Sequence, residues 1–242
     1  MNRKDVYRVI RDYWHDWFPT LHSHQEFCRR LNNLVPAVQA LAEVCAGVLC
    51  ANFEDSAAYI IDSCPIIPAK HARSSAAKSA PEYCDKNYSA SRKAYFYGAK
   101  LHAIVVRDPG KLPAAETLMI TRASVFDLTA AKEIMLNARL AHSGYLLADK
   151  AYCDSTWAEA LDLEHHLKVI TPRKKAKGDT LRSGDAYSSS VSAMRQPIES
   201  FFHWLNAHFH IQDASLVRSA MGLLFHVFSA IAAALFCKLF NS

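Results

Sequence analysis

The sequence predicts an α/β domain with a central mixed sheet flanked by helices, preceded by a small helical segment. Short apolar runs that are typical of strands alternate with longer stretches of helical spacing. Two of the runs are separated by a Pro-Gly turn, which indicates a hairpin and therefore a mixed sheet. With 242 residues, 51% of them hydrophobic, the chain can bury one sizeable core. We expect the helical segment over residues 1–54 and the α/β domain over residues 55–242.

Composition limits the classes of function without choosing one. The chain has 28 Lys and Arg against 23 Asp and Glu, and this net charge of +5 is compatible with a nucleic-acid partner but does not require one. Its seven cysteines include no Cys-x-x-Cys pair, so neither a zinc site nor a secreted disulfide framework is predicted. The N-terminus lacks the apolar core of a signal peptide. These features predict a protein of the reducing cytoplasm.

Helices are expected throughout the first fifty residues. Apolar residues recur at helical spacing from Val6 to Trp17. Ser23, followed three residues later by Glu26, forms a capping box that opens a second helix. A third helix, from about residue 36 to residue 50, is apolar almost all round. The cations of this segment are compatible with part of a DNA-binding region, although a solvated helix face is the simpler interpretation.

The rest of the chain alternates between strands and helices. Strands are predicted at residues 57–62, 95–107, 115–121, 145–148 and 168–171. Helices are predicted from Asp127 onward, at 155–166 and at 194–209. Residues 69–94 are polar and are expected to be irregular. Residues 183–193 are rich in Gly and Ser and are expected to form a mobile loop.

The stretch from Ser219 to Cys237 has two interpretations. It contains no Asp, Glu, Lys or Arg, and only His226 interrupts the apolar run. Roughly 18 such residues are enough to cross a bilayer. A buried helix at the back of the domain has the same composition. We favour the buried helix, because no second hydrophobic span exists and His226 would be costly inside a membrane.

Two acidic residues stand where predicted strands end, Asp62 and Asp149. A carboxylate there costs desolvation free energy unless something compensates, and a metal ion is a common compensation. Each acid has an alternative role as the cap of the following turn. Strand ends along one edge of a sheet bring their side chains together, so the pair suggests a site.

Glu199 is the third acid of interest. It lies on a predicted helix beside Ile198 and Phe201, so we expect its carboxylate to border the apolar face rather than to face open water. Arg195 lies one helical turn earlier, and a surface ion pair between the two is the alternative interpretation. Three carboxylates on a basic scaffold suit phosphodiester chemistry, because two Mg²⁺ ions about 3.5–4 Å apart can stabilise the attacking and leaving oxygens.

Six stretches resemble, in order, the successive blocks of DDE-type bacterial insertion-sequence transposases. They are YIIDSCPI, SRKAYFYGAKLH, TRASVFDLTAAKE, LLADKAYCD, PRKKAK and RQPIESFFHWLN. The resemblance runs from about Asp55 to the C-terminus, and it is greatest to the group numbered nine-eight-two. No single block is decisive, whereas six in order with fitting spacing are.

The resemblance implies a ribonuclease-H-like catalytic domain over residues 55–242. In the family's pattern Asp62 ends the first strand, Asp149 ends the fourth and Glu199 lies on a late helix. These three residues would be both the catalytic residues and the metal ligands, and the implied cofactor is Mg²⁺ or Mn²⁺, as two ions. Asp127 matches a recurrent acid, and a helix N-cap explains it equally well.

The resemblance also implies a set of DNA contacts. Lys150, in the Asp-Lys-Ala-Tyr block, is a candidate for holding DNA phosphate. A second block, to which structural or DNA-contacting roles are assigned, matches Tyr97, Gly98, Lys100 and His102. The basic run after Pro172 is the best candidate for the DNA backbone, and a solvated loop is its alternative. The predicted DNA-binding residues are Lys100, Lys150, Arg173, Lys174, Lys175, Lys177 and Arg195.

The chain departs from the family's pattern in two respects. Related transposases carry a Tyr-x-x-Arg-x-x-x-Glu-x-x-x-x-x-x-Lys signature, which Arg195 and Glu199 fit. Ser192 stands in the Tyr position and Asn206 in the Lys position. Asn can donate a hydrogen bond to phosphate but lacks the charge that anchors it. The chain also begins closer to Asp62 than family members do.

The implied function is DNA transposition in the bacterial cytoplasm, in association with the nucleoid when the protein is bound to DNA. Hydrolysis at the transposon ends frees 3′-hydroxyls, which attack target DNA. Because two ends must be brought together, a homodimer is expected in the DNA complex, with no membrane partner. Two alternatives remain. One is a nuclease or resolvase of the same fold, and the other is a catalytically impaired DNA-binding remnant, suggested by Asn206 and the short N-terminus.

Overall fold

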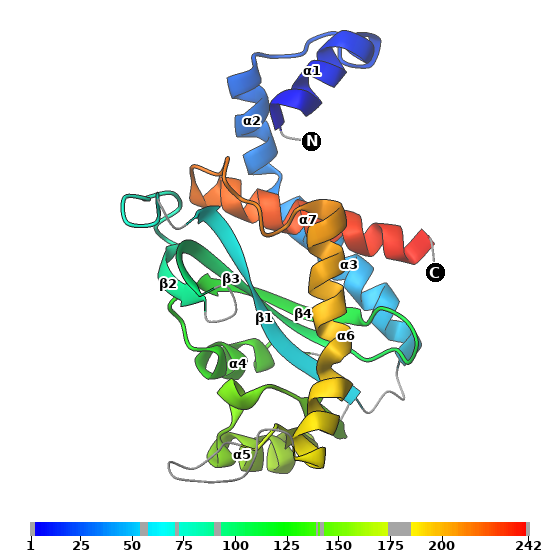
Figure 1. Cartoon of the computed structure of the whole chain (residues 1–242). Helices are drawn as coiled ribbons and strands as arrows, with labels where there is room; N and C mark the ends of the chain where they lie inside the picture. Colours follow the sequence, from blue (N-terminus) through cyan, green and yellow to red (C-terminus); the bar gives the residue numbers. More distant parts are fainter. Residues whose placement is uncertain are drawn as a thin grey trace.

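A mixed sheet lies at the centre of the protein (Figure 1). The computed structural model describes residues 3–53, 58–70, 73–89, 93–138, 140, 143–173 and 185–240. Within these residues the sheet has six strands: β1 (Ala58–Ala69), β2 (Asp85–Ser89), β3 (Ala94–Val106), β4 (Ala114–Arg122), β5 (Gly144–Leu147) and β6 (Leu167–Ile170).

The strand pairing confirms the predicted mixed sheet. β3 is antiparallel to β1 on one edge, and on its other edge it pairs with β2 and, further along, with β4. β1 pairs in parallel with β5, and β5 in parallel with β6. A parallel pair needs a crossover connection, which a helix supplies between β5 and β6. The strand predicted at residues 145–148 is the fourth of the predicted strands but the fifth along the chain, because β2 was not predicted.

Helices lie on both faces of the sheet, as predicted for the α/β fold class. They are α1 (Arg3–Tyr13), α2 (His24–Asn33), α3 (Val35–Cys50), α4 (Asp127–Met135), α5 (Ser155–His165), α6 (Ala186–Phe209) and α7 (Ala220–Phe240). Side chains of α3, α6 and α7 join one hydrophobic cluster with the sheet, and side chains of α4 and α5 join another.

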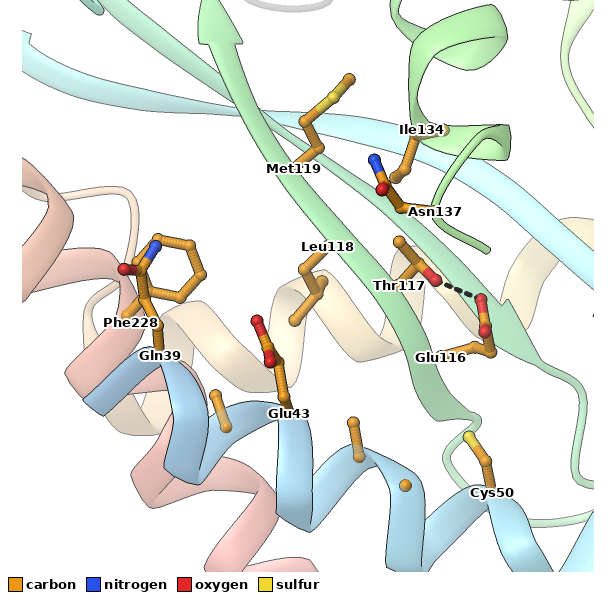
Figure 2. Close-up of a pocket in the computed structure, with 13 residues that line it drawn as sticks. Gln39, Glu43, Cys50, Glu116, Thr117, Leu118, Met119, Ile134, Asn137 and Phe228 are labelled. Atoms are coloured by element: carbon orange, nitrogen blue, oxygen red, sulfur yellow. Dashed lines mark hydrogen bonds between the residues drawn. The ribbon is translucent and has the colours of Figure 1, made fainter. Parts of the chain in front are cut away.

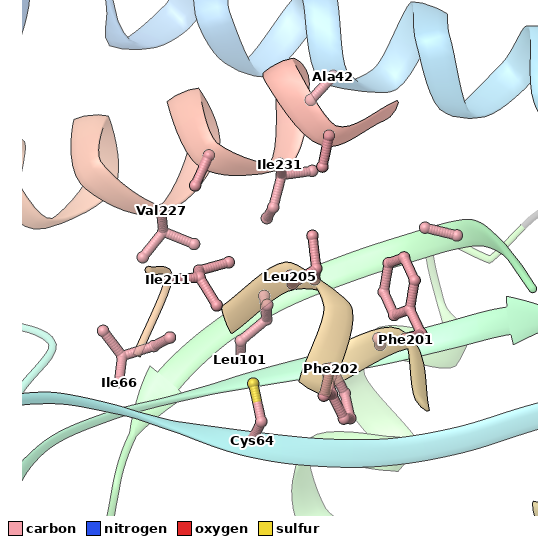
Figure 3. Close-up of a cluster of buried hydrophobic side chains, with 14 of the residues drawn as sticks. Ala42, Cys64, Ile66, Leu101, Phe201, Phe202, Leu205, Ile211, Val227 and Ile231 are labelled. Carbon is pink, nitrogen blue, oxygen red and sulfur yellow. The ribbon is translucent and has the colours of Figure 1, made fainter. Parts of the chain in front are cut away.

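Alternate residues of β1 supply the two cores. Cys64 and Ile66 belong to the cluster that α3, α6 and α7 cover, together with Ile231 of α7 (Figure 3). Tyr59 and Ile61 belong to the cluster under α4 and α5. Successive side chains of a strand point to opposite faces, so a strand that is apolar at most successive positions, as β1 is, is expected to be buried on both sides.

The apolar helix α7 packs against other helices of the protein. Among the described residues, α7 is the one unbroken helix that is long enough and apolar enough to cross a membrane. Its buried residues, Val227 and Ile231 among them, lie between α3 and the sheet (Figure 3). Its His226 side chain is within hydrogen-bond distance of the Ile211 carbonyl oxygen, at 3.1 Å. This packing agrees with the buried helix favoured from the sequence.

α1 and α2 stand at one end of the molecule and have no buried residues (Figure 1). The predicted cap of the second helix is confirmed, because the Ser23 side chain accepts a hydrogen bond from the Glu26 N–H. Tyr7 of α1 packs beside Phe27 of α2. By contrast α3 contributes Ala42 and other side chains to the main core. The predicted division at residues 54 and 55 stays a prediction.

β1 and β2 differ from the expectations. β1 continues to Ala69, because its backbone pairs with β3 as far as the partners Ala69 and Tyr97. Asp62 therefore lies inside the strand and not at its end, so that prediction was wrong. β2 falls in the stretch expected to be irregular. Its residues are polar and alternate between half-buried and exposed, so hydrophobic periodicity gave no signal for this edge strand.

The start of α6 also differs from the expectation. Residues 183 and 184 lie outside the described residues, but the rest of the predicted Gly- and Ser-rich loop is helical. Asp185 caps the helix by accepting a hydrogen bond from the Ser188 N–H. The hydroxyls of Ser190 and Ser192 donate to carbonyls four residues earlier. Serine is a poor predictor of helix because its hydroxyl competes for backbone groups, and here that bonding is satisfied within the helix.

The first prediction concerns Gly98, on β3. A Cβ there would overlap the carbonyl oxygen of Ile66 on the neighbouring strand, and this is backbone that cannot move aside. We expect Gly98→Ala to lower the free energy of unfolding by about 3 kcal/mol or more. Gly47 is the matched control, because a Cβ there meets nothing within 4 Å. Gly47→Ala, inside α3, should raise stability by up to about 1 kcal/mol. Urea unfolding of both variants measures the difference, and equal effects would contradict the packing described.

Candidate active site

Asp62 and Asp149 lie side by side at the centre of the sheet. The parallel register pairs Ile60 of β1 with Leu147 of β5, so the residues two positions further on are Asp62 and Asp149. β5 ends at Leu147, and Asp149 caps the short 3₁₀ helix that follows by accepting a hydrogen bond from the Ala151 N–H. The cap interpretation and the paired-acid interpretation of Asp149 therefore both hold.

The carboxyl of Asp62 is held in a largely buried position. Its Oδ1 accepts a hydrogen bond from the Ser63 N–H at 2.8 Å, and its Oδ2 accepts one from Arg195 Nη2 at 3.0 Å. Burial raises the pKa of Asp62 to about 6, although Arg195 and the Ser63 N–H oppose that increase. The charges of Asp149 and Asp127 raise the pKa further. Burial and neighbouring like charges both favour the neutral form of an acid.

Arg195 pairs with Asp62 and not with Glu199. Its side chain is only 10% exposed, against 22% for that of Asp62. The guanidinium Nε has no hydrogen-bond partner among the described residues. A buried charge is costly unless it is paired, so the two charges stabilise one another's burial. The surface ion pair between Arg195 and Glu199, considered as an alternative for the sequence, is not formed.

Glu199 lies one turn further along α6 than Arg195, and it is exposed. The expectation that its carboxylate borders the apolar face was therefore wrong. Ile198 and Phe202 of the same helix are buried, whereas the side chain of Glu199 faces outward. Among the described residues no three His, Cys, Asp or Glu side chains are grouped so as to hold a metal ion. The structure thus brings Asp62 and Asp149 together without Glu199.

A second polar cluster lies on the α4 side of the sheet. Asp127 accepts hydrogen bonds from Lys100 Nζ and Ser63 Oγ, both at 3.0 Å. Lys100 also donates to the Val125 carbonyl, so its charge is turned inward rather than toward a surface. Asp127 is the first residue of α4, and the N-cap is Phe126. The N-cap interpretation of Asp127 was therefore wrong, and an ion pair explains this acid.

His102, also on β3, is completely buried in this region. Its Nε2 is 2.8 Å from the hydroxyl oxygen of Thr121 on β4. Burial lowers the pKa of His102 to about 4, with Asp127 opposing and Lys100 reinforcing that change. A neutral imidazole that bridges two strands supports the structural role considered for this residue.

Tyr152, to which the sequence assigned no role, lies near the acidic pair. Its side chain is buried, and its hydroxyl has no hydrogen-bond partner among the described residues. Burial raises the pKa of Tyr152 well above its ordinary value, and the charges of Asp62, Asp127 and Asp149 raise it further. The hydroxyl therefore lies within the electrostatic field of all three acids. Its position three residues after Asp149 was the available signal.

Two of the predicted DNA-binding cations share a surface near the start of α6. Lys150 and Arg173 are both exposed. The pKa of Asp185 is lowered mainly by the Ser188 N–H, and the charges of Arg173 and Lys150 contribute as well. The Arg173 guanidinium lies over the Tyr187 ring, 5.4 Å from its centroid. The remaining members of the basic run, Lys174, Lys175 and Lys177, lie outside the described residues.

The second prediction concerns the ionisation of Asp62. Its carboxyl should titrate near pH 6 in a ¹³C NMR experiment, and Arg195→Gln should raise this pKa, because the main opposing charge is removed. Between about pH 4 and about pH 6, the raised pKa keeps the Asp62 carboxyl protonated in the folded state, whereas the same carboxyl is ionised in the unfolded chain. The free energy of unfolding should therefore fall as pH rises from about 4 to about 6, and Asp62→Asn should remove that dependence.

Asp154 provides the internal reference for this titration. Its pKa is lowered, first by the Trp157 N–H, so it should titrate below the ordinary range of an aspartate in the same spectra. An Asp62 pKa at or below that of Asp154 would contradict the buried environment described.

A model of the family described as "Transposase DDE domain" matches residues 58–235, a span that contains the whole sheet and Glu199. No curated protein and no solved structure matches the chain. The narrower resemblance to the group numbered nine-eight-two stays a prediction. The mixed sheet and its flanking helices form the ribonuclease-H-like fold expected of this family. Because the match covers most of its length, the chain belongs to the transposase DDE domain family.

Proposed function

We propose that this transposase cuts DNA at transposon ends and joins the freed 3′-hydroxyls to target DNA. The observation that carries the proposal is the juxtaposition of Asp62, on β1, and Asp149, two residues after the end of the adjacent parallel strand β5, within a DDE domain. These residues are 87 positions apart in the chain, so folding alone brings them together. Asp62 is largely buried, and the like charge of Asp149 beside it raises the free energy of its ionised form unless a cation is shared between them.

The residues proposed to hold that cation are Asp62, Asp149 and Glu199. Hard carboxylate oxygens are the ligands that Mg²⁺ and Mn²⁺ prefer. Burial raises the pKa of Asp62, and a bound cation would favour its ionised form. Two of the three residues fit this role by chemistry and by position. When bound, two ions would stabilise the attacking and leaving oxygens of an in-line displacement.

Asp62 is neutralised by an ion pair with Arg195. One oxygen of Asp62 is bound to its guanidinium at 3.0 Å. A cation that binds Asp62 must compete with this ion pair. Glu199 lies four residues later on the same helix, and Pro197, which lies between the two, cannot donate a helical hydrogen bond. A small adjustment of α6 at this weak point is our proposed route by which Glu199 replaces Arg195 beside Asp62.

The proposed phosphate contacts are the exposed cations near this pair. Lys150 follows Asp149 directly, and Arg173 shares its surface. With Lys174, Lys175 and Lys177 from the sequence, they would neutralise backbone phosphates without reading bases. Lys100 and Arg195 remain in the predicted set of DNA-binding residues, but each has a carboxylate partner inside the protein.

The alternative of an impaired DNA-binding remnant draws on the two departures from the signature. Ser192 donates its hydroxyl to the Ser188 carbonyl within α6. Asn206 accepts a hydrogen bond from the Gln212 N–H at 3.2 Å, which fastens the turn after α6. Both side chains thus have local structural partners, and Glu199 lies outside the acidic pair. A remnant would retain DNA without cutting it.

The third prediction separates these functions. With a labelled, pre-cut transposon end and Mg²⁺ or Mn²⁺, the protein should join the 3′-hydroxyl to target DNA. Asp62→Asn, Asp149→Asn and Glu199→Gln should each abolish cleavage and joining while DNA binding persists, because backbone contacts come from other residues. The matched control is Glu159→Gln, an exposed acid on α5, which should leave the reaction unchanged.

Each outcome of this assay decides among the functions. Cutting without joining would indicate a nuclease, and retention of DNA without either reaction would indicate a remnant. Full activity of Asp149→Asn would show that the assigned site is wrong.

The fourth prediction tests the competition between Arg195 and the cation. Arg195→Gln frees an oxygen of Asp62 and removes a neighbouring positive charge, so Mn²⁺ should bind about tenfold more tightly, equivalent to about 1.4 kcal/mol. Isothermal titration calorimetry at pH 8, where Asp62 is ionised, measures the affinity. Lys132→Gln is the charge-matched control, because Lys132 pairs with Asp154 instead. Weaker Mn²⁺ binding by Arg195→Gln would show that Arg195 supports the metal site.

A further inference from the structure

A groove of about 620 Å³ lies outside the candidate active site, between α3, β4 and α4 (Figure 2). Four consecutive residues of β4, from Glu116 to Met119, line it. Successive side chains of a strand point to opposite faces. Leu118 packs with the core under α3 and α7, and Met119 packs with the core under α4. A groove that touches both residues runs along the edge of β4 and not over one face of the sheet.

That edge of β4 is open in the part of the chain that the structure describes. β4 pairs with β3 on one side, and no described strand pairs with it on the other. In an antiparallel ladder alternate residues direct both the N–H and the C=O away from the partner strand. The regular ladder runs from Thr117 to Arg122, so alternate residues of this segment present backbone groups at the open edge, and the groove lies beside its first part, from Thr117 to Met119. An open edge of this kind is a template for another strand.

The walls of the groove leave room for a chain. The α3 wall includes small residues, among them Ala46 and Gly47, and a Cβ added at Gly47 would meet nothing within 4 Å. Phe228 of α7 and Ile134 of α4 supply apolar surface (Figure 2). An occupant thus finds backbone partners on one side and apolar side chains above and below.

The charge of the groove is opposite to that of the protein as a whole. Its charged lining residues are Glu43 of α3 and Glu116 of β4, with no Lys or Arg among the lining residues described. The chain carries a net charge of +5. Carboxylates at this position repel DNA phosphate and attract cationic side chains. The groove is therefore unsuited to the DNA that the candidate active site would bind.

We propose that this groove is a docking site for an extended basic peptide segment of a partner protein, which adds to the open edge of β4. Main-chain hydrogen bonds to Thr117–Arg122 give the affinity, and alternate side chains give the selectivity, as in β-strand addition generally. Lys or Arg side chains of the segment face Glu43 and Glu116 on the α3 side. The intervening apolar side chains face Met119 and Ile134 on the α4 side.

The test uses a fluorescein-labelled, end-capped seven-residue peptide of alternating Lys and Val. Its fluorescence anisotropy should saturate on titration with the whole protein, with an affinity that falls as salt is added. Two altered peptides probe the two features of the groove. Replacing Lys by Glu should remove binding, because the groove is acidic. Methylating the backbone nitrogens of alternate residues should also remove it, because the donors that pair with β4 are lost while the charge is kept.

Protein variants test whether the peptide binds in the groove. Gly47→Trp should abolish binding, since Gly47 lines the groove, its Cβ position is open and a large side chain there would fill the space. Glu43→Lys, at an exposed position, should weaken binding at least tenfold. Glu159→Lys on α5 is the charge-matched control and should leave binding unchanged. Bound peptide should also slow hydrogen exchange of the amides from Thr117 to Arg122.

Three results would overturn the proposal. These are equal binding of the backbone-methylated peptide, undiminished binding by Gly47→Trp, and no saturation at millimolar protein. The methylated peptide uses the unaltered protein, so the proposal stays falsifiable even where a variant fails to fold.

Discussion

The pairing of β1 along both of its edges is the constraint on which the rest of the structure depends. β1 pairs with β3 along one edge and with β5 along the other, so the position of β1 is determined from both sides. Because successive side chains alternate, the adjacent residues Asp62 and Ser63 serve opposite faces. Asp62 meets Arg195 of α6, and Ser63 meets Asp127 of α4. One dipeptide thereby connects the candidate active site to the polar cluster beneath α4.

The same kind of ion pair lies on both faces of the sheet. On each face a carboxylate that is largely removed from water is neutralised by a long basic side chain, Arg195 for Asp62 and Lys100 for Asp127. The compensation is incomplete on both faces. Among the described residues, the hydroxyl of Tyr152 and the Nε of Arg195 lack partners around Asp62, and the Nδ1 of His102 lacks one near Asp127. Buried polar groups are seldom left unsatisfied without reason. In the metal site that we propose here, such groups would be available to bound ions and phosphate oxygens.

α3 illustrates how one helix can serve two surfaces. The sequence predicted a helix that is apolar almost all round, and such helices are usually buried on every side. In the structure one side packs against α7 and the sheet, while Leu41, Val44 and Val48 on the outer side are between 47% and 64% exposed. A third side lines the groove beside β4. Apolar surface that the chain itself does not cover is expected where another chain binds.

The α/β class and most of the elements were predictable, because they depend on local signals. The hydrophobic periods of β3 and α5, the capping box at Ser23 and the Pro-Gly turn before β4 are properties of neighbouring residues. Resemblance over six ordered blocks identified the family. Elements without an apolar period escaped prediction. β2 is a polar edge strand ordered by its pairing with β3, and the start of α6 is a serine-rich segment stabilised by the Asp185 cap.

The arrangement of the site was decided by the tertiary structure. The sequence nominated Asp62 and Asp149, and the parallel register of β1 and β5 places them together. No local pattern could show that β1 continues past Asp62, because its later pairing with β3 joins residues between 28 and 39 positions apart. Nor could the spacing of Arg195 and Glu199 tell which of them faces Asp62. Both lie within one turn of the same helix, and only the packing of α6 against the sheet directs Arg195 inward and leaves Glu199 in water.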